Sequence, residues 1–156
     1  MTNDPPERDY LTPRGIQVVT GYARGLTVGQ IAAELGIGEK TVASYTQRAA
    51  KMLGLKGARQ AALVDYAYRH GYLTVEQPRP RQTLPPRLEQ VLDCAARGLG
   101  ARATAAELGI ATKTARRHRD RLHHALGVHT TARAVAVAWE AGLRSGRPTS
   151  QEGPEQ

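Results

Sequence analysis

The sequence predicts an all-α protein made of two tandem four-helix units, and three observations support this fold class. The chain has 156 residues, enough for one ordinary domain or two very small ones. Aromatic residues make up only 4% of it and Phe is absent, which suits a small helical core better than a β-sandwich. The chain also repeats itself, and glycines divide each copy into segments of helical length.

The internal repeat aligns residues 11–54 with residues 84–127, at an offset of 73. Identical residues fall in runs, as expected for a duplicated module of roughly 60 residues. Beyond Gly54 the copies fall out of step by two residues, and they close similarly at Gly71 and Gly142. The longest identical runs pair Ala23–Leu26 with Ala96–Leu99 and Ala32–Ile37 with Ala105–Ile110.

Composition places the boundaries between the copies and at the ends. Pro78 and Pro80 oppose a helix between the copies and favour an extended spacer. Both chain ends are rich in Pro, Gly and polar residues, which is typical of disorder. We therefore expect a disordered N-terminus (1–10), a first domain (11–73), a linker (74–83), a second domain (84–144) and a disordered tail (145–156).

Local signals predict four helices in the first copy. Thr12 is a plausible N-cap, with Pro13 at the first helical position. Thr27 caps a short second helix, and Gly36 ends it. The third and fourth helices end before Gly54 and Gly71. The expected helices are residues 13–23, 28–34, 39–53 and 59–69.

The second copy repeats the same pattern with a weaker start. Pro85 stands where the first copy has its Thr cap, and Leu88 leaves no acid for a capping box. We still expect four helices here, because the glycine spacing is kept. They are residues 86–96, 101–107, 112–126 and 131–140.

Within each copy, a short helix, a glycine turn and a longer helix form a helix-turn-helix pattern. In the first copy, Ala32 and Ala33 are small enough to let the two helices approach closely. Leu35 and Ile37 hold the turn against the core. Gly36 is expected to be left-handed, a conformation that a side chain would disfavour.

These residues carry a resemblance to a known family. The pattern L-T-P-R…A-R-G-L-T…I-A-A-E-L-G-I…E-K-T-V…L-G resembles the LuxR-type (GerE-like) helix-turn-helix domain of bacterial transcription regulators. Residues 11–73 match closely. Residues 84–143 match the scaffold but have Thr104 and Ala115 where the family usually has Ile and Val. The resemblance implies a DNA-binding unit. Its third helix enters the major groove, and its fourth helix often provides the contact between the subunits of a dimer. A homodimer through the fourth helices is therefore one expectation.

The outward face of each third helix coincides with the positions through which the family contacts DNA. Residues three, four and seven apart share one face of a helix, which turns Val42, Ala49 and Leu53 inward in the first copy, and Ala115, Leu122 and Leu126 inward in the second. The candidate DNA-binding residues are Lys40, Thr41, Ser44, Gln47 and Lys51, and then Lys113, Thr114, Arg116, Arg117, His118 and Asp120.

The chemistry of these side chains suits different parts of a duplex. The Lys and Thr at the start of each helix are expected to meet phosphate oxygens. Arg116 or Arg117 fits a guanine edge, Gln47 an adenine, and Ser44 either base. Asp120 either accepts from a cytosine amine or pairs with Arg116 one turn back. For His118 we expect a packing or phosphate role.

The charge of the chain points to a polyanionic partner. Lys and Arg number 22 against 14 Asp and Glu, for a net charge of +8, and such an excess attracts nucleic acid or an anionic surface. Residues 1–78 carry nine basic and seven acidic side chains, whereas residues 79–156 carry thirteen and seven. The second copy is therefore expected to supply most of the phosphate affinity.

Other function classes have no support in the residues. There is no placed nucleophile with its base and no Gly-rich phosphate loop, so we expect no enzyme activity and no cofactor. No run of about 18 apolar residues exists, so no membrane partner is expected. Arg outnumbers Lys 18 to 4, which suggests a bacterial source, and the single Cys94 favours a reduced, cytoplasmic compartment. The DNA binding that the resemblance implies adds the expectation of a nucleoid-associated protein. Metal binding is not expected at His118, His123, His124 and His129, whose spacing splays the rings apart.

The sequence therefore predicts a sequence-specific double-stranded DNA-binding transcription regulator with two reading heads in one chain. The alternative is that the first copy has become a docking module, because Ala43, Ser44 and Gln47 make its outward face nearly neutral. Its partner would then be RNA polymerase, a sigma factor or another regulator.

Overall fold

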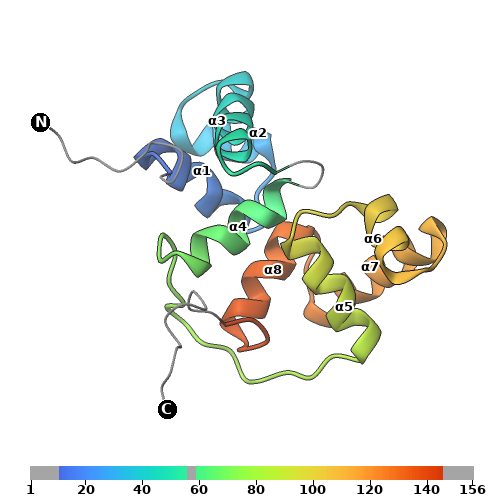
Figure 1. The fold of residues 1–156 in the computed structure, drawn as a ribbon. Coiled ribbons are helices and arrows are strands. Elements are labelled where there is room, and N and C mark those ends of the chain that lie inside the picture. The colour runs from blue at the N-terminus through green and yellow to red at the C-terminus, as the bar shows by residue number, and fades with distance from the viewer. Residues whose placement is uncertain (1–10, 56–58, 146–156) are drawn as a thin grey trace, which may run out of the picture.

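The computed structural model describes residues 11–55 and 59–145, and this part of the chain is all-helical, with eight helices and no strand (Figure 1). The disorder was predicted for residues 1–10 and 145–156, and of these only Ser145 lies within the described residues. The helices are α1 Pro13–Ala23, α2 Val28–Leu35, α3 Glu39–Met52, α4 Arg59–Arg69, α5 Pro86–Ala96, α6 Ala101–Leu108, α7 Thr112–Leu126 and α8 Thr131–Glu140. All eight agree with the predicted ranges to within one residue.

The predicted caps explain why the helices begin and end where they do. Thr12 accepts a hydrogen bond from the backbone N–H of Gly15 at 3.0 Å. Thr27 forms a capping box with Gln30, each side chain bonding the backbone N–H of the other residue. Gly36 is left-handed, with φ 68°, as predicted from the turn. Pro85 makes no side-chain cap for α5.

Helices α1 and α2 touch at a glycine in the first copy but not in the second. A Cβ placed on Gly21 would lie 2.5 Å from Cγ1 of Ile31, a separation that real Cβ contacts do not show. At the offset of 73, the equivalent residues in the second copy are Cys94 and Thr104, both 1% exposed. The smaller Thr104 therefore leaves room for the Cys94 side chain, which explains the departure from the usual Ile.

The two copies share one hydrophobic core rather than forming separate bodies. In Figure 1, α4 and α8 lie side by side at the centre, and they pack on each other. The first helix of each copy also contacts the fourth helix of the other. Leu63, Val64 and Val135 are completely buried, and Tyr68 stacks on Trp139 with ring centroids 5.5 Å apart. At the offset of 71 that aligns the ends of the two copies, these two rings are equivalent, so the joint has an approximate twofold character.

A polar cluster is embedded in this joint. The Asp65 carboxylate, only 5% exposed, accepts hydrogen bonds from Trp139 Nε1 at 2.8 Å and from Arg144 Nε at 2.6 Å. Arg69, one turn along α4, donates to the same carboxylate at 3.1 Å. The buried charge is thus both paired and hydrogen-bonded, as a buried carboxylate must be to persist. We call Asp65, Trp139 and Arg144 the Asp65 cluster.

The segment between the copies, residues 74–83, contains no helix and is held against α8. Arg79 donates from its backbone N–H to the carbonyl of Glu140 at 2.8 Å and from Nε to the carboxylate of Glu140 at 2.7 Å. Arg133 also pairs with that carboxylate, at 3.0 Å, and donates to the carbonyl of Ala23 at 3.1 Å. The segment is therefore fastened to the joint along part of its length.

Candidate nucleic-acid interface

Helices α3 and α7, the second helices of the two helix-turn-helix pairs, bury the faces that the sequence predicted. On α3, Val42 and Ala49 are buried, and Leu53 just beyond its end is half-buried. On α7, Ala115, Leu122 and Leu126 are buried. Because these anchors fix the rotation of each helix, the opposite face must point to solvent.

The outward face of α3 contains all the candidate residues of the first copy. Lys40, Thr41, Gln47 and Lys51 are exposed, and Ser44 is half-buried. The two lysines lie near opposite ends of the helix, and the outward side chains between them, Ala43, Ser44 and Gln47, are neutral. The exposed Arg48 lies beside this face, with its guanidinium carbon 5.2 Å from the centroid of the Tyr45 ring.

The outward face of α7 is more strongly charged. Lys113, Arg116, Arg117 and Asp120 are exposed, while Thr114 and His118 are half-buried. Of the two roles predicted for Asp120, pairing with Arg116 is wrong in this structure, since no ion pair joins these two side chains. Both arginines are therefore free of ion pairs with the described residues.

One further arginine of α7 turns away from this face. Arg119 is half-buried and donates from Nη2 to the carbonyl of Leu99 at 3.4 Å, and burial lowers its pKa. At the offset of 73, Arg119 corresponds to Thr46, whose hydroxyl contacts that of Tyr22 at 2.7 Å. The second copy has Ala95 in place of Tyr22, so a long side chain has room to lie inward. The sequence analysis left Arg119 out of the candidate DNA-binding residues, but it did not predict this inward contact.

Two histidines of α7 lie at the edge of the core. Burial lowers the pKa of His118, and Arg121, Arg87 and Arg117 lower it further by repelling the protonated ring. Burial also lowers the pKa of His123, whose Nε2 lies 3.0 Å from the Thr131 hydroxyl at the start of α8. Both rings therefore favour the neutral form, and His123 fastens α7 to α8.

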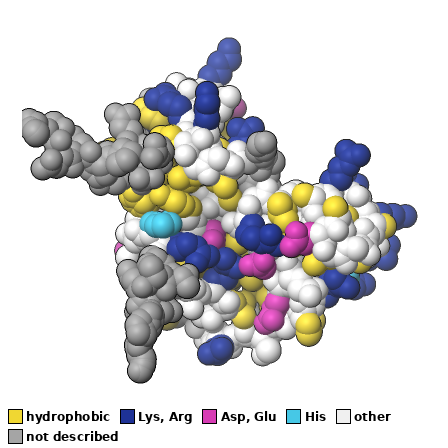
Figure 2. Space-filling view, in the orientation of Figure 1, with side chains coloured by type: hydrophobic (Ala, Val, Ile, Leu, Met, Phe, Trp, Pro, Cys, Tyr) yellow, Lys and Arg dark blue, Asp and Glu magenta, His cyan; other side chains and the backbone are white. Residues whose placement is uncertain are grey.

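Positive side chains gather at the two helix-turn-helix ends of the molecule. Figure 2 shows Lys and Arg side chains projecting at the top, over α2 and α3, and at the right edge, over α6 and α7. Near the centre of this view, acidic side chains lie among the basic ones. The separation fits a polyanion that is contacted at two places.

The described part of the chain offers no metal site, no membrane-spanning helix and no reactive thiol. No group of three or more metal-ligating side chains comes together there, and none of its helices is long and apolar enough to cross a bilayer. Cys94 is buried between α5 and its neighbours, and burial raises the pKa of its thiol. The unreactive neutral thiol is therefore favoured.

An all-α chain with two helix-turn-helix pairs, each turning a polar face to solvent, falls in the class of helix-turn-helix DNA-binding proteins. The family model for bacterial regulatory proteins of the luxR family matches residues 9–64 and residues 82–138. The chain therefore belongs to the luxR family and carries two tandem copies of its DNA-binding, transcription-regulating module. No curated protein and no solved structure matches the chain.

Sequence reasoning missed the joint between the copies. The signals were present but isolated: Asp65 interrupts an otherwise apolar run of α4, and Trp139 is the only tryptophan of the chain. Neither residue reveals its partner in the sequence, because Asp65 lies 74 residues from Trp139 and 79 residues from Arg144.

Proposed function

We propose that this protein is a sequence-specific, double-stranded DNA-binding transcription regulator that places both reading helices on one duplex as a single polypeptide. Membership of the luxR family supports DNA binding and transcription regulation. The packing of α4 on α8 supports the placement of both reading helices on one duplex. It joins α3 and α7 in one body, as the dimer interface of a one-module protein would. That packing also covers the faces that a homodimer through the fourth helices would need.

The residues that we propose as DNA contacts are the exposed side chains of α3 and α7. Lys40, Thr41, Lys113 and Thr114 lie at the starts of the reading helices, where side chains and backbone amides meet phosphates. We assign base reading to Ser44 and Gln47 in the first copy, and to Arg116, Arg117 and Asp120 in the second. Lys51 and His118 are assigned to the backbone.

The recognition site that follows is asymmetric. A homodimer presents the same helix twice and reads a palindrome, whereas α3 and α7 present different side chains. One half of the site should depend on guanine through the α7 arginines, and the other should tolerate more sequences.

A binding-site selection on random duplexes tests this function. We expect one chain per selected duplex and two unlike half-sites. Inserting about 5 or about 10 base pairs between them should each weaken binding strongly, because the α4–α8 joint fixes the spacing and a full turn of about 10.5 base pairs does not restore it. Selection of a symmetric palindrome, or full tolerance of the longer insertion, would contradict the proposal.

The second candidate function keeps α7 on DNA and makes α3 a docking surface for RNA polymerase, a sigma factor or another regulator. The observation that favours it is the neutral middle of the α3 face, formed by Ala43, Ser44 and Gln47. Removing residues 1–78 cannot decide the matter, since this would strip α4 from α8. Replacing Lys40 and Lys51 with Ala can: unchanged DNA affinity favours docking, and a large loss favours two reading heads.

A further inference from the structure

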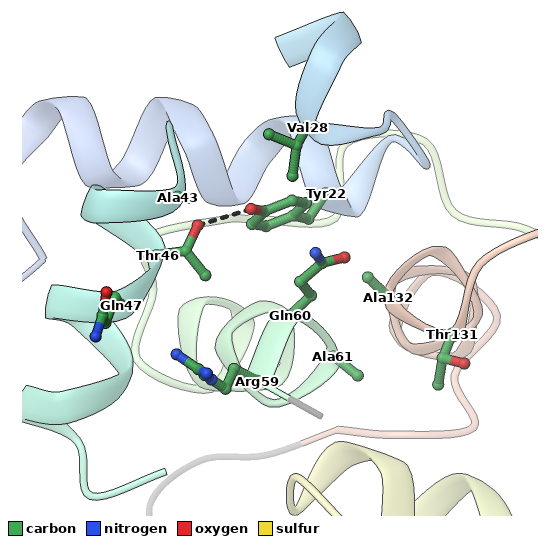
Figure 3. A pocket seen from close by; sticks show the side chains of 10 residues that line it. All are labelled: Tyr22, Val28, Ala43, Thr46, Gln47, Arg59, Gln60, Ala61, Thr131 and Ala132. Carbon is green, nitrogen blue, oxygen red and sulfur yellow. Dashed lines mark hydrogen bonds between the residues drawn. The ribbon is translucent and has the colours of Figure 1, made fainter. Parts of the chain in front are cut away.

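An open cleft of about 560 Å³ lies beside the first reading helix, where the two copies meet. Figure 3 shows its walls: α3 on one side, the first turn of α4 with Arg59 and Gln60, and the first residues of α8 opposite. The Tyr22 ring closes its inner end, with its hydroxyl 2.7 Å from that of Thr46. The cleft is thus built by both copies and opens to solvent.

The rim of this cleft is continuous with the proposed DNA-reading surface. Gln47 belongs both to the outward face of α3 and to the lining of the cleft. Arg59 is exposed, extends toward α3, and forms no ion pair with the described residues. In Figure 1 the start of α4 lies between the α2–α3 end and the α6–α7 end of the molecule. A duplex that crosses this side of the molecule from one helix-turn-helix end to the other would pass close to the start of α4.

Because the cleft is open to solvent and has polar groups at its rim, it suits contact with a DNA backbone better than it suits an enclosed small ligand. Its rim contributes the guanidinium of Arg59 and the side-chain amide of Gln60, groups that bind phosphate and sugar oxygens. The copies differ here as well: at the offset of 71, Arg59 corresponds to the neutral Thr130. The first copy has Ala43 and Ser44 where the second has Arg116 and Arg117, and it has an arginine at position 59 instead.

This proposal rests on the proposed function. We propose that Arg59, together with Gln60 at the rim of the cleft, binds the sugar–phosphate backbone of the DNA between the two half-sites. The contact supplies affinity without reading sequence, and it adds a phosphate contact to those assigned to the lysines of α3.

The test compares Arg59→Gln with Arg14→Gln in the full chain, measuring the dissociation constant for the selected duplex and for a scrambled duplex at several salt concentrations. Arg14 is the matched control because it loses the same charge at the start of α1, where it bonds Gln17. Arg59→Gln should weaken binding to both duplexes by on the order of tenfold at low salt and reduce the salt slope by about 0.9. Arg59→Lys should retain the slope, and Arg14→Gln should change neither quantity.

The possible results separate this inference from the proposed function. If the wild-type chain binds no duplex, the proposed function fails. If it binds, but Arg59→Gln keeps the wild-type salt slope, only the backbone contact is wrong. A loss confined to the selected duplex would also overturn it, because it would make Arg59 a reader of bases. Since Arg59 is exposed, unchanged thermal unfolding is expected for both of its variants.

Discussion

The two copies show how one scaffold tolerates different interiors while keeping its frame. The frame is the same in both: Arg24 pairs with Glu34 at 2.9 Å, and the equivalent Arg97 pairs with Glu107 at 2.9 Å. Between the helices, however, the first copy sets a glycine against a large side chain, and the second sets Cys94 against Thr104. Each pair fills the same space in its own way, so the copies have diverged in compensated steps rather than one residue at a time.

The outward faces have diverged without such compensation. Ala43 and Ser44 on α3 correspond to Arg116 and Arg117 on α7, and Gln47 corresponds to Asp120. Nothing in the core demands these exchanges, because all six side chains lie on the outward faces. The difference teaches that the interior preserved the geometry of the reading helices while their chemistry was free to change.

Breaking the joint between the copies should have the largest effect. Asp65→Ala leaves Arg144 and the Trp139 indole without their buried acceptor, and removing one partner of a buried pair typically costs about 3–5 kcal/mol. We expect a loss of that size in the free energy of unfolding measured by denaturant titration. Glu34→Ala, which removes an exposed ion pair, is the control and should change stability little. Equal stability of the two variants would show that the Asp65 cluster does not hold the copies together.

Removing the charged reading face should affect DNA binding more than removing the neutral one. Each good contact between a side chain and a base edge is worth about 1–3 kcal/mol of discrimination. Arg116→Ala with Arg117→Ala should therefore lower specific affinity by roughly 100-fold or more, and Ser44→Ala with Gln47→Ala by about tenfold. Titration of the selected duplex measures both.

Equal losses in these two variants would remove the distinction between the copies. An intact specific affinity in the double arginine variant would remove the site assignment on α7 altogether. Arg121→Ala, an exposed arginine of the same helix outside the proposed contacts, is the matched control.

Replacing Gly21 and Ile31 by the residues found at the equivalent positions of the second copy, Cys94 and Thr104, tests whether these two positions compensate for each other. Gly21→Cys alone should destabilise the chain by about 1–3 kcal/mol, because the new side chain overlaps Ile31. Adding Ile31→Thr should recover part of this loss, giving a favourable coupling on the order of 1 kcal/mol. A double-mutant cycle in denaturant measures the coupling; strict additivity would mean that the two positions changed independently.

The smallest effect is expected from pH. The lowered pKa values of His118 and His123 mean that the unfolded chain takes up protons more readily than the folded one. Stability should therefore be highest above the ordinary histidine pKa of about 6.5 and decline as the pH falls below it.

Thermal unfolding at pH 7.5 and 5.5 measures this decline. His118→Gln with His123→Gln should reduce it, whereas His124→Gln, at an exposed position of the same helix, should not. A decline as steep in the double variant as in the wild type would show that other groups cause it.

Sequence reasoning reached the helices and the rotation of the reading helices because these are set by local signals. The Thr27 cap, the left-handed Gly36 and the apolar spacing from Val42 to Ala49 all act within a few residues. These signals predicted which candidate side chains would be outward, and the exposed or half-buried positions of α3 and α7 agree.

The remaining features depend on contacts between distant residues, which no local pattern reveals. Arg119 lies inward because Ala95, on a different helix, leaves room. The α4–α8 joint depends on Asp65 meeting Arg144 from the other copy. In both cases the deciding partner is far along the chain, so periodicity could assign a face but not a neighbour.

The Asp65 cluster makes the two ends of the molecule unlike. It ties the copies together through unlike residues, so the molecule has no true symmetry axis, and its two ends cannot be exchanged. If both copies bind one double helix, as proposed, the unlike ends would hold that helix in a single orientation. Such a complex would distinguish upstream from downstream, which a symmetric pair of identical subunits does not do unaided.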